Sequence, residues 1–177
     1  MKLSNGLSLS RLVFLGSHLY FSQFLSPFVN GILVILNYLL DSIDGPISRK
    51  FGGTSYGEFM DISVDRIITL GYYAFHVFNH RLNFFFFLAI LFRNIFVDYI
   101  SYFELIKKHK KERHKLNKGF AYWIYTSKIS KIINGTLQMG ISAWGFFGIV
   151  PWELQILFLI TSYTRAMPSA KKLAKNI

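Results

Sequence analysis

The sequence contains no cysteine, and little of it is charged. Without cysteine the chain has no disulfide, no thiolate nucleophile and no cysteine-ligated zinc site. Asp, Glu, Lys and Arg make up 16% of its 177 residues, whereas 52% are apolar and 18% aromatic, and the mean hydropathy is +0.34. This composition excludes an ordinary soluble domain and an intrinsically disordered chain. It predicts instead a chain whose apolar stretches cross a bilayer.

Acidic residues are scarce as well, because nine Asp and Glu stand against 20 Lys and Arg, for a formal net charge of +11. In a chain this apolar, the excess predicts contact with anionic lipid or with a phosphorylated substrate. The densest basic run, residues 107–118, lies between two apolar segments. We therefore predict that it lies on a membrane surface, and we expect membrane lipids, and no nucleic acid, as its partners.

Long uncharged segments define the expected helices. No residue between Arg11 and Asp41 carries a formal charge, and Pro27, Asn30 and Gly31 are predicted to break this stretch into two helices. Four more apolar segments follow, at residues 62–78, 82–103, 121–147 and 152–163. The pattern predicts an all-α integral membrane protein with six transmembrane helices in a single domain, 1–177.

The distribution of basic residues predicts the orientation of these helices. With six spans and the N-terminus inside, every connection that falls on the inner side is basic, whereas Arg81 alone falls outside. The expected topology is therefore N-in and C-in, in the cytoplasmic (inner) membrane, without a cleavable signal peptide. The end of the second helix and the start of the third then face the cytoplasm.

Five of the nine acidic residues crowd into residues 41–65. Asp41 and Asp44 are three residues apart at the end of the second expected helix, and Asp61 and Asp65 are four apart at the start of the third, so each pair shares a helical face. A hairpin joined by the polar stretch 48–56 would bring both faces to one cytoplasmic boundary. Four converging carboxylates predict a site for Mg²⁺ or Mn²⁺, because hard divalent cations prefer oxygen ligands.

In order, these residues resemble the signature of the CDP-alcohol phosphotransferase (phosphatidyltransferase) family, integral membrane enzymes of phospholipid synthesis. The family pattern D-x2-D-G-x2-A-R-x8-G-x3-D-x3-D is matched here from Asp41 to Asp65, with Ser48 in place of alanine and a spacer of seven residues in place of eight. Weaker similarities lie at residues 5–11, which resemble the N-terminal N-x-L-T-x-x-R element, and at residues 127–134.

The resemblance implies a reaction and a set of roles. The family transfers a phosphatidyl group from CDP-diacylglycerol to a small alcohol and releases CMP, with the active site at the cytoplasmic ends of the second and third helices, and its members are homodimers. The implied metal ligands, for two ions, are Asp41, Asp44, Asp61 and Asp65. Asp65 is also the implied general base, and the implied CDP-binding residues are Asp41, Gly45, Ser48, Arg49 and Gly57.

The acceptor alcohol is left open by the sequence, with glycerol 3-phosphate and inositol or inositol phosphate as the two types considered. A phosphorylated acceptor needs cations away from the CDP site. The basic residues expected within or at the ends of the later helices are Arg93, Lys128, Lys131 and Arg165. Those near helix ends also fit an ordinary role, in which the side chain extends to the lipid headgroups.

Two other classes of protein place clustered aspartates at a membrane boundary. A membrane prenyltransferase also binds a diphosphate through acidic motifs and Mg²⁺, but its motifs are normally far apart in a longer chain. A non-enzymatic carrier of divalent cations is the other alternative. Gly45, Arg49 and Gly57 disfavour a carrier, because an ion path needs neither a phosphate-binding arginine nor room for a nucleotide.

Overall fold

The computed structural model describes residues 3–50, 55–107 and 127–175, and every regular element in this part of the chain is helical. The prediction of six helices is confirmed for these residues. They are α1 (Leu3–Phe21), α2 (Pro27–Lys50), α3 (Ser55–Phe78), α4 (Phe84–Lys107), α6 (Lys128–Trp144) and α7 (Trp152–Lys175), with a short 3-10 helix, η1 (Ser22–Phe24), between the first two. Judged on the described residues, none of these helices has both the length and the apolar character needed to cross a membrane.

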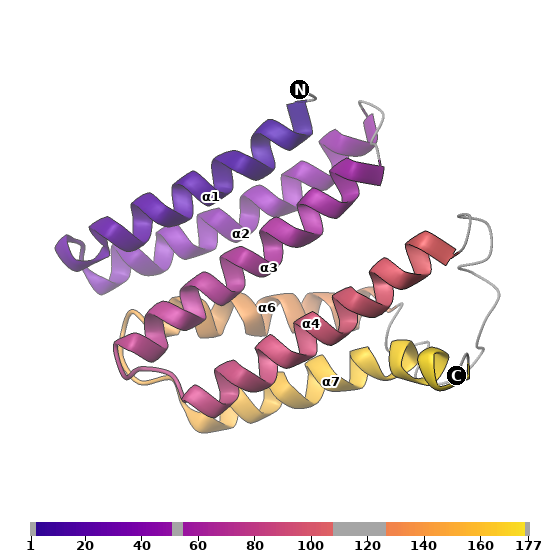
Figure 1. Cartoon of the computed structure of the whole chain (residues 1–177). Helices are drawn as coiled ribbons and strands as arrows, with labels where there is room; N and C mark the ends of the chain where they lie inside the picture. The colour runs from indigo at the N-terminus through magenta and orange to yellow at the C-terminus, as the bar shows by residue number, and fades with distance from the viewer. Residues whose placement is uncertain (1–2, 51–54, 108–126, 176–177) are drawn as a thin grey trace. The chain divides into compact units, whose positions relative to one another are not determined.

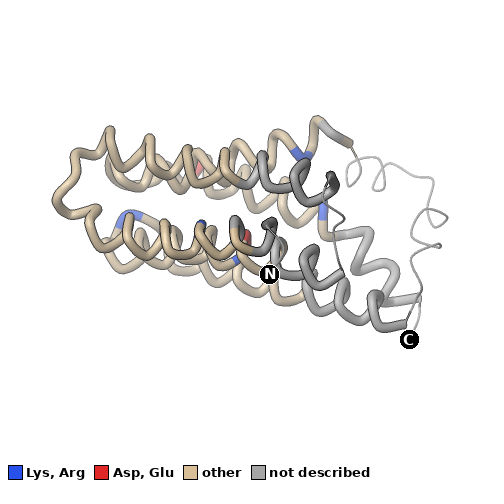
Figure 2. The backbone as a smooth tube through the Cα atoms, turned by 90° about the horizontal axis from the view of Figure 1, so that it is seen from above, with Lys and Arg blue, Asp and Glu red and all other residues tan. Residues whose placement is uncertain are grey.

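The chain divides into two compact units. Unit 1 comprises Met1–Phe87 and Gln138–Val150, and unit 2 comprises Leu88–Leu137 and Pro151–Ile177. Within unit 1, α1, α2 and α3 run side by side (Figure 1). Within unit 2, α4 runs beside α7, and hydrogen bonds join the two helices (Figure 1). Among the residues that Figure 2 colours by type, few are Lys, Arg, Asp or Glu.

The predicted break between the first two helices is displaced in the structure. The chain leaves α1 through η1, and α2 begins at Pro27, where a proline costs nothing because the first N–H of a helix has no intrahelical partner. Ser26 caps this end, since its Oγ accepts a hydrogen bond from the N–H of Val29 at 3.3 Å. Asn30 and Gly31 therefore lie inside α2, and the prediction that they break the helix is wrong.

Asn30 instead belongs to a buried polar chain that joins α1, α2 and α3. Its Nδ2 donates to the carbonyl of Ser22 at 2.9 Å, so its Oδ1 is free to accept from His18 Nε2 at 3.0 Å. With the proton on Nε2, His18 Nδ1 accepts from the Tyr72 hydroxyl, also at 3.0 Å. Asn37 Nδ2 then donates to the same hydroxyl at 3.3 Å. These hydrogen bonds give partners to buried polar groups, which would destabilise the fold if they were left without any.

The turn between α3 and α4 is closed by main-chain hydrogen bonds. Arg81 N–H donates to the carbonyl of His76 at 2.8 Å, and His80 N–H donates to that of Val77 at 3.0 Å, which is the Schellman arrangement. This arrangement requires the left-handed conformation at His80, whose φ is 55°. The carbonyl of Arg81 accepts from Val150 N–H at 2.8 Å, so the turn is tied to the segment that follows α6.

Asn83 caps α4, and its replacement gives a direct measure of that cap. Its Oδ1 accepts from the N–H of Phe85 at 2.8 Å and from that of Phe86 at 3.3 Å. We expect Asn83→Ala to lower the free energy of unfolding by about 1 kcal/mol, because two helical N–H groups lose their acceptor. Asn83→Ser, which restores an acceptor, should unfold close to wild type in a denaturant titration in detergent. Equal unfolding of the alanine and serine variants would contradict the assigned cap.

Candidate functional site

The four predicted metal ligands occupy the same end of unit 1. Asp41 and Asp44 lie in the C-terminal half of α2, and Asp61 and Asp65 lie in the N-terminal half of α3. Figure 1 places the C-terminal end of α2 beside the N-terminal end of α3, at the end of the unit where α1 begins. Both aspartate pairs therefore lie in continuous helices, with the backbone arrangement that their predicted convergence requires.

The connection between these two helices is shorter than predicted. The polar stretch 48–56 was expected to form it, but α2 continues to Lys50 and α3 begins at Ser55. Ser48, Arg49 and Lys50 continue α2 although they are polar, because Arg and Lys are good helix formers. Of the predicted CDP-binding residues, Asp41, Gly45, Ser48 and Arg49 are thus helical in α2, and Gly57 is helical in α3.

Among the predicted ligands, the structure describes the side chain of Asp65, whereas those of Asp41, Asp44 and Asp61 lie outside the described side chains. The side chains that are described form no cluster of three or more candidate ligands. The donor set fits a hard divalent cation on two grounds, namely its carboxylate chemistry and the 37% exposure of the Asp65 side chain, whose Oδ1 is buried beside Arg11.

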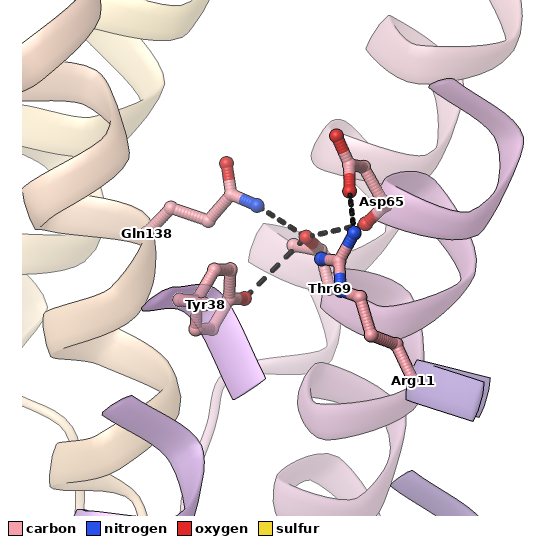
Figure 3. Close-up of polar contacts among 5 residues, drawn as sticks. All are labelled: Arg11, Tyr38, Asp65, Thr69 and Gln138. Atoms are coloured by element: carbon pink, nitrogen blue, oxygen red, sulfur yellow. Dashed lines mark hydrogen bonds and ion pairs between the residues drawn. The ribbon is translucent and has the colours of Figure 1, made fainter. Parts of the chain in front are cut away.

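Asp65 forms an ion pair with Arg11 of α1. Arg11 Nη1 lies 3.0 Å from Asp65 Oδ1, and Figure 3 shows the guanidinium pointing at the carboxylate. The two partners differ sharply in exposure, because the side chain of Arg11 is 1% exposed and that of Asp65 is 37% exposed. The arginine therefore lies inside the helical bundle, and the carboxylate lies at its boundary. Sequence reasoning noted Arg11 only as part of the N-terminal element and did not predict this pairing.

One turn further along α3, Thr69 anchors a second set of polar contacts (Figure 3). Thr69 Oγ1 donates to the main-chain carbonyl of Asp65 at 2.9 Å. It accepts from Gln138 Nε2 of α6, and the Tyr38 hydroxyl of α2 lies 3.4 Å away. Tyr38 also lies 3.0 Å from Ser142 Oγ, again in α6. The turn of α3 that carries Asp65 is thus tied to both α2 and α6.

Sequence reasoning missed these partners, although a signal for them exists in the spacing of polar residues. Four of the buried or half-buried polar residues of α3, namely Asp65, Thr69, Tyr72 and His76, follow one another at intervals of four, three and four. Such spacing keeps residues on one side of a helix. Polar residues that recur in this way within an apolar segment indicate a face turned toward the protein interior.

The four acceptor-phosphate candidates, Arg93, Lys128, Lys131 and Arg165, belong to unit 2. Arg93 Nε donates to the carbonyl of Ser162 in α7 at 3.4 Å, and its Nη1 donates to Asn94 Oδ1 at 3.0 Å. Lys131 is exposed and Arg165 is half-buried, whereas the side chain of Lys128 lies outside the described ones. Most of the basic run 107–118 also lies outside the described residues. Arg93 therefore has a defined set of contacts within unit 2.

Comparison with known proteins bears directly on this site. The family model described as CDP-alcohol phosphatidyltransferase matches residues 1–164, which include both aspartate pairs and Arg11. No curated protein and no solved structure matches the chain significantly. The matched range covers most of the chain, and it extends well beyond the motif between Asp41 and Asp65 from which the resemblance was first drawn.

Proposed function

The chain belongs to the CDP-alcohol phosphatidyltransferase family, and from this premise we propose that it transfers a phosphatidyl group from CDP-diacylglycerol to a small alcohol and releases CMP. The family implies a CDP-alcohol substrate. The observation that carries the proposal is the partly exposed Asp65 side chain at the end of unit 1 where all four motif aspartates lie. We propose further that the acceptor is either glycerol 3-phosphate or an alcohol of the inositol type, meaning inositol or inositol phosphate.

Asp41, Asp44, Asp61 and Asp65 would hold Mg²⁺ or Mn²⁺, in a family that is generally metal-dependent. When bound, the metal neutralises the diphosphate and stabilises the leaving CMP. The helical spacing supports convergence of the two pairs.

Asp65 has a second proposed role as the general base. It would accept the proton of the acceptor hydroxyl as that oxygen attacks the phosphorus of the donor, and a base in this role must lie within hydrogen-bond reach of the attacking group. Its half-exposed carboxylate, held by Arg11 at 3.0 Å, is available for this contact. Gly45, Ser48, Arg49 and Gly57 would contact the CDP group, with Arg49 pairing with phosphate oxygens.

A phosphorylated acceptor would need a cation of its own. Arg93 is the candidate that we favour, because its guanidinium is held by hydrogen bonds to the carbonyl of Ser162 and to Asn94 Oδ1. Fixed guanidinium groups suit the recognition of phosphate, since their donors match two of its oxygens. Lys128, Lys131 and Arg165 remain predictions for the same role.

The family is membrane-embedded, and we propose that this chain crosses the inner membrane six times, N-in and C-in, as one domain and as a homodimer. Large apolar side chains that are mostly exposed support burial in lipid, because a soluble surface rarely carries so many of them. They include Phe28, Phe78, Phe85, Phe92, Ile149 and Trp152. The proposed topology places the four aspartates at the cytoplasmic face.

The proposal is tested by CMP release from the purified protein in detergent. We expect release from CDP-diacylglycerol only when Mn²⁺ or Mg²⁺ and one acceptor of a panel are present, the panel being glycerol 3-phosphate, inositol, inositol phosphate and serine. Chelation with EDTA should abolish release, and added Mn²⁺ should restore it. A folded protein that releases no CMP with any acceptor of the panel would contradict the proposed reaction.

A further inference from the structure

Arg11 is a cation buried in a helix that contains no acidic residue. The sequence of α1, Leu3–Phe21, includes neither Asp nor Glu, and the Arg11 side chain is 1% exposed. Removing a guanidinium from water is costly, and a packed apolar side chain of similar volume is often at least as stabilising as a buried ion pair. A role in packing alone therefore gives no reason for an arginine at this position. The role must be sought in its partner across the helix interface, Asp65.

The Arg11 side chain contacts the Asp65 carboxylate from the interior of unit 1. Arg11 Nη1 lies 3.0 Å from Asp65 Oδ1, and the arginine is buried where the carboxylate is 37% exposed. A ligand that arrives at the exposed side of the carboxylate thus meets Asp65, while Arg11 stays behind it. Arg11 is consequently placed to act on a ligand through the carboxylate and not by direct contact.

The backbone that carries Asp65 is held independently. Thr69 Oγ1 donates to the Asp65 carbonyl at 2.9 Å, and Thr69 is bonded in turn to Gln138 and lies 3.4 Å from the Tyr38 hydroxyl (Figure 3). These contacts fix the position and rotation of this turn of α3. With the backbone fixed, the remaining freedom of Asp65 is that of its side chain, and the contact with Arg11 restricts this freedom.

We propose that Arg11 is a positioning residue, which holds the Asp65 carboxylate in the orientation that binds a divalent cation and faces the acceptor hydroxyl. This inference rests on the proposed function, and it assigns a role in the site to the first helix. Hydrogen-bonded partners behind a metal ligand typically change metal affinity or activity by about 10- to 100-fold when they are removed. The same range is expected here.

The test measures Mn²⁺ binding directly, by electron paramagnetic resonance of free and bound Mn²⁺, alongside the kinetics of CMP release. We expect Arg11→Met to weaken Mn²⁺ binding by about 10- to 100-fold and to lower kcat, with a smaller change in KM for CDP-diacylglycerol. Arg11→Lys keeps the charge but loses the planar guanidinium, so its Mn²⁺ affinity and its kcat should lie between those of Arg11→Met and wild type. If Arg11→Met does not fold, the Mn²⁺ affinity of Arg11→Lys tests the proposal instead. A weaker affinity than wild type would support the proposal, and an unchanged affinity would overturn it.

His18→Gln supplies the matched control, since His18 is also a buried polar residue of α1 but contacts Tyr72 and Asn30. It should lower thermal stability and leave Mn²⁺ affinity unchanged. If Arg11→Met behaves in the same way, Arg11 is only structural and the inference is overturned. Tighter Mn²⁺ binding by Arg11→Met would also overturn it, because the arginine would then compete with the metal. A wild-type protein that neither binds Mn²⁺ nor releases CMP would overturn the proposed function itself.

Discussion

Replacing Asp65 with asparagine is expected to lower the rate of acceptor-dependent CMP release by about 100- to 10,000-fold, the range that a general base contributes. Asparagine has nearly the same shape but cannot accept the hydroxyl proton, and it removes one negative charge from the proposed metal site. Its side-chain oxygen can still accept a hydrogen bond from Arg11, so the contact between α1 and α3 should survive. The loss should therefore appear in kcat at saturating donor and acceptor.

Glu153 provides the matched control for this substitution. It is an exposed carboxylate in the first turn of α7, and Glu153→Gln removes the same charge outside the aspartate motif. This variant should release CMP at the wild-type rate. Thermal unfolding of both variants in detergent should lie close to wild type. An Asp65→Asn protein that is folded and retains most of its activity would rule out Asp65 as the base.

Adding a single methyl group at Gly145 is expected to destabilise unit 1 by about 1–3 kcal/mol, the usual cost of overpacking a core. A Cβ at this position would lie 2.5 Å from three ring atoms of His76. The ring has little freedom to move, because it is fully buried and its Nε2 donates to the carbonyl of Ser142 at 2.8 Å. The Gly145 carbonyl is held as well, since it accepts from Arg81 Nη1 at 3.1 Å.

Gly140 supplies the control for this prediction, because it tests whether the cost depends on the position of the glycine or on replacing any glycine with alanine. It lies within α6, and apart from its chain neighbours and the adjacent backbone of that helix, no atom lies within 4 Å of a Cβ built there. Gly140→Ala should therefore leave stability unchanged or raise it by up to about 1 kcal/mol, because alanine favours the helix. The comparison is made by titrating both proteins with denaturant in detergent. Equal stability of Gly145→Ala and Gly140→Ala would show that the His76 ring does not pack against Gly145 as described.

Local features of the chain were predicted well from the sequence. Apolar segments separated by polar or basic ones led to six helices, and the aspartate spacings placed Asp41 and Asp44 on one helix and Asp61 and Asp65 on the next. The errors lie at helix ends. Asn30 is a weak helix former in isolation, but in α2 its side chain bonds the carbonyl of Ser22, and this tertiary contact outweighs its propensity. Residues 48–50 continue α2 for a different reason, because Arg and Lys are good helix formers and polarity alone does not end a helix.

The sequence by itself determined the aspartate pairs, their expected helical spacing and the resemblance that leads to the family of the chain. Only the tertiary structure decided which residues contact Asp65 and the turn of α3 that carries it. Arg11 meets Asp65, and Thr69 meets both Tyr38 and Gln138, across separations of up to 69 residues along the chain. Helical periodicity is set by hydrogen bonds four residues apart, so it predicts which face a residue occupies. The partner opposite that face is chosen by the packing of whole helices, which no local pattern encodes.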